Sequence, residues 1–167
     1  MKTLYLVRHA KSSWKNPDFS DFERPLNKRG ERDVPFMGKL MKEKGLKPDL
    51  IISSPAKRAL ITAKAIAEKL HYPVEKIVEE DRLYDNTVRE LMKVIHGVDN
   101  KVDYLMLIGH NPSFTETANL LCDYSVDNIP TCAVFAIDFD MDNWSQLETT
   151  TGVFKFFEYP KKYKEQS

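Results

Sequence analysis

Two strongly apolar segments of the chain each lead directly into a histidine. Residues 3–8 (TLYLVR) precede His9, and residues 104–109 (YLMLIG) precede His110. Short apolar runs of this kind are typical of strands that are buried on both faces of a parallel sheet. Ligands bind beyond the carboxyl ends of the strands in such sheets, so we expect both histidines at one edge of one sheet.

Strand and helix patterns alternate along the chain. We expect strands over residues 49–53 and near 74–78, and helices over 27–45, 54–70, 88–96 and 112–122. Ser54 is the expected N-cap of the second helix, with Pro55 at its first position, and Pro35 is expected to kink or split the first helix. Repeated strand–helix units with short connections predict an α/β fold, a three-layer α/β/α sandwich with a mostly parallel sheet.

The last third of the chain has a different pattern. Residues 132–139 and 152–159 are rich in β-formers and are separated by a turn that contains Trp144. These segments predict an antiparallel edge to the sheet. The length favours a single domain over residues 1–167, in which the charged residues 160–167 form a solvated tail.

Charge and composition exclude several classes of function. The 25 basic and 25 acidic residues balance, so there is no overall attraction to nucleic acid or to an anionic membrane surface. No apolar run approaches the ~20 residues that a membrane helix needs. Cys122 and Cys132 form no CxxC pair, and the first residues do not have the pattern of a secretory leader. We therefore expect unpaired buried thiols and a cytoplasmic protein. The sequence does not predict the oligomeric state.

Two arginines indicate that an anion binds near the histidines. Arg58 falls in the first turn of an expected helix, where a positive charge is unfavourable unless an anion is close. Arg8 directly follows an apolar strand, where a buried charge needs a partner. With His9 and His110, these residues predict an anion-binding site in which an imidazole is available as nucleophile or acid–base.

Three sequence blocks carry a resemblance to a known family. LVRHAKSSW, SSPAKRALITA and IGHNPS resemble, in this order, the motifs of the histidine phosphatase superfamily, which has the phosphoglycerate mutase-like fold. The short length and the segments RHAKS and PLNKRG are most similar to the small SixA-type phosphohistidine phosphatases.

The resemblance implies a role for each matching residue. His9 is the nucleophile that becomes phosphorylated, and Arg8, Arg58 and His110 hold the phosphoryl oxygens. We also place Asn111, which follows His110, among the substrate-binding residues. A neutral imidazole that attacks phosphorus in line, with cationic donors around the equatorial oxygens, is consistent with phosphoryl-transfer chemistry. Neither a metal nor a cofactor is expected.

The chain departs from the family pattern at two positions. Ala10 replaces the glycine that follows the nucleophilic histidine, which is tolerable where φ is negative. Tyr84 stands where mutase-like members carry a glutamate that protonates the leaving group, and Asp85 is a possible replacement acid. An alcohol leaving group needs such a proton, whereas the imidazole of a phosphoramidate needs less help. The missing glutamate therefore favours a P–N bond.

These observations leave several functions to compare. The leading hypothesis is a metal-independent phosphatase that acts through a phosphohistidine intermediate, with a histidine-phosphorylated protein as substrate. A small phosphorylated molecule is the alternative substrate, in a phosphate-ester phosphatase or mutase with Asp85 as acid. A phosphate-binding regulatory module would need the cations but not the nucleophile. A metallohydrolase would need ligand spacings that the sequence lacks.

Overall fold

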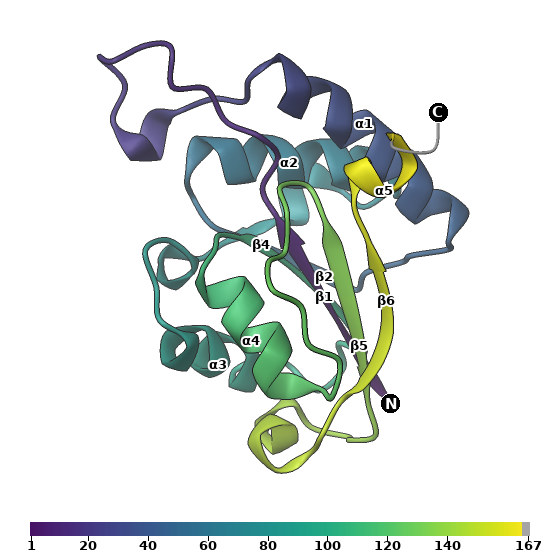
Figure 1. Cartoon of the computed structure of the whole chain (residues 1–167). Coiled ribbons are helices and arrows are strands. Elements are labelled where there is room, and N and C mark those ends of the chain that lie inside the picture. The colour runs from purple at the N-terminus through teal and green to yellow at the C-terminus, as the bar shows by residue number, and fades with distance from the viewer. Residues whose placement is uncertain (165–167) are drawn as a thin grey trace.

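One mixed sheet forms the centre of the protein. The computed structural model describes residues 1–164, and its six strands have the order β3-β2-β4-β1-β5-β6 (Figure 1). Strands β3, β2, β4 and β1 are parallel, whereas β5 runs antiparallel to both β1 and β6. The strand bounds are Lys2–Arg8 (β1), Leu50–Ser53 (β2), Val78–Glu79 (β3), Tyr104–Gly109 (β4), Val134–Phe139 (β5) and Val153–Glu158 (β6). The predicted mostly parallel sheet with an antiparallel edge is confirmed.

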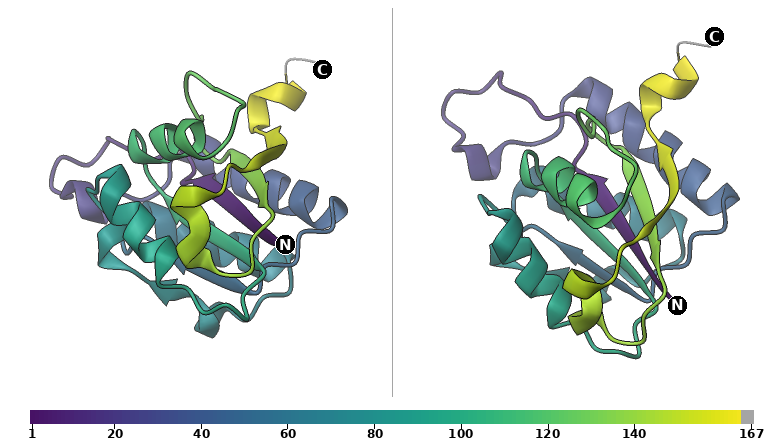
Figure 2. Two further views of the ribbon diagram at one scale, coloured as in Figure 1. Left: turned by 90° about the horizontal axis from the view of Figure 1, so that it is seen from below. Right: turned by 60° about the horizontal axis from the view of Figure 1, so that its bottom comes forward.

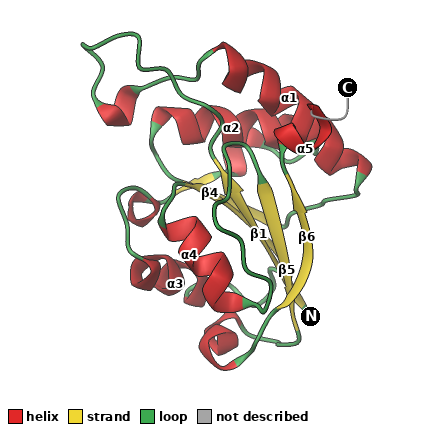
Figure 3. Cartoon of the chain, in the orientation of Figure 1, coloured by secondary structure: helices red, strands yellow, loops and turns green. Residues whose placement is uncertain are grey.

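Helices cover both faces of this sheet. Helices α1 and α2 lie on one face, and α3 and α4 lie on the other (Figure 3). The α-helices are Lys28–Glu43 (α1), Lys57–Lys69 (α2), Val88–His96 (α3), Ser113–Leu121 (α4) and Pro160–Lys164 (α5). The three-layer α/β/α architecture predicted from the alternating pattern is therefore correct.

Alternation along the central strands divides the core into two halves. In β1, Leu4 and Leu6 pack toward α3 and α4, whereas Tyr5 and Val7 pack toward α1 and α2. All four side chains are 3% exposed or less. Burial of a large apolar side chain contributes about 1.5–3 kcal/mol, so this strand must be apolar on both faces. The same requirement explains the apolar run of β4.

The first helix is continuous and is not split at Pro35. Helix α1 runs from residue 28 to 43 with Pro35 inside it, and Asn27 caps its start by accepting a hydrogen bond from the backbone N–H of Gly30. Pro35 and Glu31, whose carbonyl loses its usual donor, are both exposed. Water can therefore satisfy the group that the proline leaves without a partner.

Helix α2 begins later than predicted, and Ser54 is not its N-cap. The cap position is Ala56, and the helix starts at Lys57 rather than near Pro55. The backbone N–H of Ser54 donates to the carbonyl of Ile108, so Ser54 still belongs to the edge of the sheet. Its hydroxyl lies 2.8 Å from Nε2 of His110.

Three further elements differ from the prediction. The strand expected near residues 74–78 is a 3-10 turn (η2, Val74–Lys76) followed by the two-residue strand β3. Helix α4 covers Ser113–Leu121 and is one residue shorter at each end than predicted, with Pro112 at the cap position. The turn that contains Trp144 is a 3-10 helix (η4, Trp144–Thr149), because the fully buried indole anchors it through a hydrogen bond to the carbonyl of Val102.

The expected tail over 160–167 is folded in part. Residues 160–164 form α5, in which Lys162 pairs with the buried Glu158 at 3.2 Å and Tyr163 packs edge-on against Phe36 of α1. Residues 165–167 lie outside the described part of the chain. The expectation of a solvated tail therefore missed a local partner, the Glu158 carboxylate.

Two general expectations concern cysteines and membranes. Cys122 and Cys132 are buried, and no disulfide joins them. Within residues 1–164, no helix has the length and apolar character needed to cross a membrane.

Parallel pairing of β1 and β4 aligns the ends of these two strands. Val7 lies opposite Ile108 and Arg8 opposite Gly109, and the N–H of His9 donates to the carbonyl of Gly109 at 3.0 Å. A long segment, residues 12–25, leaves the same edge after β1 and projects from the body in each view (Figures 1 and 2).

Gly109 permits the close packing of this edge, which gives a first test. A Cβ atom at Gly109 would lie 2.6 Å from Cζ of the fully buried Phe114. We expect Gly109→Ala to lower the free energy of unfolding by about 1–3 kcal/mol through overpacking, measured by urea unfolding. Gly97→Ala is the control, because its Cβ would meet nothing nearer than 3.7 Å. Equal urea midpoints for the two variants would contradict this account of Gly109.

Candidate active site

The carboxyl ends of β1, β2 and β4 surround a polar cleft. His9 and His110 lie side by side there, with ring centroids 5.0 Å apart. The cleft has a volume of about 460 Å³ and is lined by Arg8, His9, Asp21, Arg24, Arg58, Tyr84, Asp85, His110 and Asn111. The structure therefore brings together every residue that the sequence placed in the site, and it adds three.

His9 is held as a neutral imidazole with one defined tautomer. Its Nδ1 lies 2.7 Å from the carbonyl oxygen of Ala10, which can only accept, so Nδ1 carries the proton. Nε2 then keeps its lone pair. Burial lowers the pKa of His9 to about 3, and the charges of neighbouring His110, Arg58 and Arg8 act in the same direction. An unprotonated Nε2 is the form that a nucleophile requires.

His110 is fixed by two partners. Its Nε2 lies 2.8 Å from the hydroxyl of Ser54, and its Nδ1 lies 3.4 Å from Nη2 of Arg58. A guanidinium only donates, so Nδ1 accepts and Nε2 donates to Ser54 in this state. Burial, followed by the charge of Arg58, lowers the pKa of His110 to about 4. Ser54 is thus used to orient His110 rather than to cap α2.

The two predicted arginines have different partners. Arg8 donates from Nη1 to the carbonyl of Ile129 at 3.0 Å, and its buried Nε has no hydrogen-bond partner among residues 1–164. Arg58, 6% exposed, donates to the backbone carbonyl and the carboxylate of Asp21 at 2.6 and 3.1 Å. Asp21 is therefore the anion that the position of Arg58 required.

Sequence reasoning missed Asp21, Arg24 and Tyr84 as members of the site. The Asp21 carboxylate accepts hydrogen bonds from Arg24 at 3.0 Å and from the Tyr84 hydroxyl at 2.8 Å, besides that from Arg58. Burial would raise the pKa of Asp21, but the hydrogen bonds from Tyr84, Arg24 and Arg58 outweigh it and lower the pKa to about 2. The one sequence signal for Asp21 was the unbalanced charge of Arg58, which gives no position for its partner.

The remaining predicted residues lie at the rim. The side-chain amide of Asn111 donates to the carbonyl of Ile129 and accepts from the hydroxyl of Thr115. Both its nitrogen and its oxygen therefore already have partners within the protein. Asp85 is exposed, with a φ of 50°. Ala10 is buried outside the left-handed region of φ, so the usual glycine is not required there.

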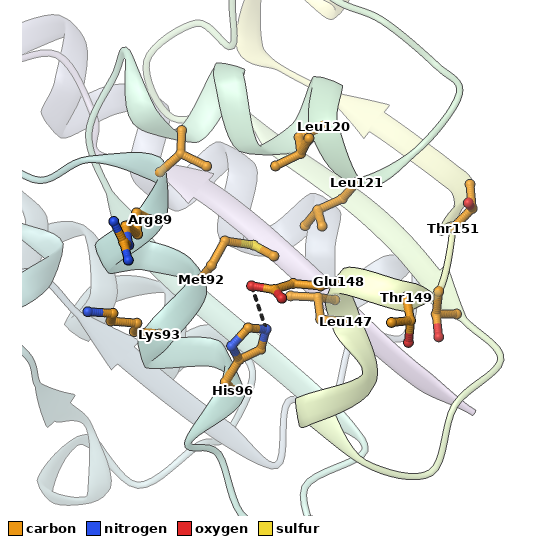
Figure 4. Close-up of a pocket in the computed structure, with 12 residues that line it drawn as sticks. Arg89, Met92, Lys93, His96, Leu120, Leu121, Leu147, Glu148, Thr149 and Thr151 are labelled. Carbon is orange, nitrogen blue, oxygen red and sulfur yellow. Dashed lines mark ion pairs between the residues drawn. The ribbon is translucent and has the colours of Figure 1, made fainter.

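A larger cavity of about 690 Å³ lies between α3, α4 and η4 (Figure 4). Its lining includes apolar Met92, Leu121 and Leu147 and charged Arg89, Lys93 and Glu148, and Oε1 of Glu148 lies 3.9 Å from Nε2 of His96. None of the residues predicted for anion binding lies in it. We therefore place the functional site in the smaller cleft. Within residues 1–164, no three His, Cys, Asp or Glu side chains are grouped to hold a metal ion.

Comparison with solved structures shows the fold. The protein histidine phosphatase SixA complexed with tungstate superposes with a TM-score of 0.81 at 20% identity, covering 96% of this chain and 98% of that one. A candidate phosphohistidine phosphatase SixA from Agrobacterium tumefaciens gives a TM-score of 0.79 at 25% identity, covering 95% of this chain and 98% of that one.

A sequence relative of a different kind covers less of the chain. The 2,3-bisphosphoglycerate-dependent phosphoglycerate mutase of Chelativorans sp. is 32% identical over 91 residues, which are 53% of this chain and 44% of the mutase. The match therefore covers less than half of that enzyme.

A family model provides the assignment. The model of the histidine phosphatase superfamily (branch 1) matches residues 4–88, which include most of β1, the segment with Asp21, and α2 with Arg58. The matched part is just over half of the 167 residues. On this match, the chain belongs to the histidine phosphatase superfamily, branch 1.

Proposed function

We propose that the protein is a metal-independent phosphatase that hydrolyses phosphohistidine in a protein through a phosphohistidine intermediate on His9. The observation that carries the proposal is the His9–Ala10 hydrogen bond, which leaves Nε2 unprotonated beside three arginines. The SixA structures support the choice of substrate, because the SixA that superposes with a TM-score of 0.81 is a protein histidine phosphatase.

The proposed reaction has two steps. Nε2 of His9 attacks the phosphorus of the substrate, and the P–N bond to the substrate imidazole breaks while Arg8, Arg58 and His110 contact the phosphoryl oxygens. The departing imidazole nitrogen takes a proton from water. Water then attacks the phosphoryl group on His9, which releases orthophosphate and restores the neutral imidazole.

The state of the cleft carboxyls favours a leaving group that needs no strong acid. A general acid must carry its proton at the working pH. Asp21 is ionised because its pKa lies near 2, and the Tyr84 hydroxyl donates its hydrogen bond to Asp21. Among the residues that line the cleft, this leaves Asp85 at the exposed rim as the carboxyl available for an acid role.

A phosphate-ester phosphatase or mutase is the second candidate. The likeness to the phosphoglycerate mutase and the position of Asp85 at the cleft favour it. In that reaction, Asp85 would protonate the alcohol oxygen of a small phosphorylated substrate.

The nucleophile is tested by trapping the intermediate. Incubation with a ³²P-labelled phosphohistidine protein should give an acid-labile, base-stable phosphoenzyme in the wild type and none in His9→Ala. His96→Gln is the control, because His96 lines the other cavity. The mechanism fails if His9→Ala retains substantial turnover.

The protonation state of His9 is tested by NMR titration of its ring. The folded protein should keep His9 neutral from pH 8 to pH 5, since its pKa is lowered to about 3. In urea the same ring should titrate near its ordinary value of about 6.5. The unfolded chain binds the extra proton between these values, so His9 stabilises the fold above pH 6.5 and this stabilisation is lost as the pH falls toward 3. A folded-state midpoint near 6.5 would contradict the neutral nucleophile.

The substrate class is tested by comparing leaving groups. Hydrolysis of a phosphohistidine protein should exceed that of alkyl phosphate monoesters by at least about 10²-fold, the usual range of general-acid catalysis that esters would lack here. Activity should persist in EDTA, and Asp85→Asn should change the phosphohistidine rate less than about twofold. Loss of all activity in Asp85→Asn, or a sugar phosphate as the best substrate, would establish the ester reaction instead.

A further inference from the structure

The carboxylate of Asp21 occupies donors that a phosphoryl group in this cleft would use. Both terminal nitrogens of Arg58 donate to Asp21, at 2.6 Å to its carbonyl and 3.1 Å to Oδ2. Arg24 donates to Oδ1 from Nε at 3.2 Å and from Nη2 at 3.0 Å. The Asp21 carboxylate thus engages the fork of Arg24 and Nη2 of Arg58, while the Asp21 carbonyl engages Nη1 of Arg58.

The contacts of Arg58 with His110 make the overlap specific. Nη2 of Arg58 lies 3.1 Å from Oδ2 of Asp21 and 3.4 Å from Nδ1 of His110. A phosphoryl oxygen that contacts Nη2 of Arg58 and Nδ1 of His110 must therefore share Nη2 with the Asp21 carboxylate or displace that carboxylate. In contrast to Nη2, the buried Nε atoms of Arg8 and Arg58 have no hydrogen-bond partner among residues 1–164.

The segment that carries Asp21 can move without disturbing the core. Residues 14–23 are all exposed, and the ends of the segment are joined by the hydrogen bond from Ser13 N–H to the Pro25 carbonyl. Its contacts with the body include those of Asp21, the edge-on packing of Phe22 on Tyr84 at 5.2 Å, and Lys57 near the ring of Phe19. A segment with few buried contacts opens at low free-energy cost.

We propose that Asp21 is an internal anion that competes with the phosphoryl group for Arg58 and Arg24. The inference extends the proposed function, since it concerns how that same site takes up and releases phosphate. A state closed by Asp21 lowers the apparent affinity for phosphate by the fraction of molecules that are open. The competition therefore weakens the binding of the orthophosphate product and favours its release.

Calorimetric titration with inorganic phosphate tests the competition. Asp21→Asn keeps the size of the side chain but removes its charge, and should bind orthophosphate at least about tenfold more tightly than the wild type. Asp18→Asn is the matched control: it removes the same charge from the same segment, outside the cleft lining, and should bind within about twofold of the wild type.

A second variant guards against misfolding of the segment. Tyr84→Phe removes one hydrogen bond to Asp21 without a change of charge, and should tighten phosphate binding by about two- to fourfold. Thermal unfolding should show a larger rise in Tm with phosphate for both variants than for the wild type.

Two results would overturn the inference. Equal or weaker phosphate binding in Asp21→Asn would show that Asp21 only orients the arginines, and absence of phosphate binding in every protein would remove the competition. These assays use orthophosphate and no turnover. A protein that binds phosphate in the expected order but does not hydrolyse phosphohistidine would refute the proposed function and leave this inference intact.

Discussion

The parallel pairing of β1 with β4 is the constraint on which the site depends. Register places Arg8 opposite Gly109, so His9 and His110 leave the sheet side by side although they lie far apart in the sequence. The two strands are central and buried on both faces, which fixes this register by packing rather than by the polar groups themselves. The histidines of the cleft therefore follow fully buried strands, whereas Asp21 lies on an exposed segment.

Burial shapes the chemistry of the two histidines as much as hydrogen bonding does. Both rings are less than 10% exposed and sit beside guanidinium groups, so the pKa of each is lowered and each remains neutral at physiological pH. A neutral ring is costly to protonate here but ready to attack or to donate one hydrogen bond. In the proposed reaction, the same arginines that disfavour protonation of His9 would hold the phosphoryl anion, so one set of charges would serve both purposes.

The sequence predicted those features that depend on periodicity or on motif positions. The sheet, its layers, helix α3 and the placement of Arg8, His9, Arg58 and His110 follow from apolar patterns and strand ends. The predicted start of α2 was wrong because the Ser54 hydroxyl bonds to His110. This contact lies far away in the sequence and cannot be predicted from local sequence patterns. Asp21 was missed for the same reason: its partners Arg58 and Tyr84 are 37 and 63 residues away in the chain. Such tertiary contacts override local preferences and are visible only in the folded structure.

The hydrogen bond between Ser54 and His110 has a consequence for the protons of the cleft. A serine hydroxyl rotates freely and serves equally as donor or acceptor. When Nδ1 of His110 faces an incoming oxyanion instead of the Arg58 guanidinium, the imidazole can adopt its other tautomer and Ser54 can turn to donate to Nε2. The ring then presents an N–H to the ligand while its net charge stays the same. His110 can thus change its contact from the Arg58 guanidinium to a bound oxyanion while the cleft neither gains nor loses a proton.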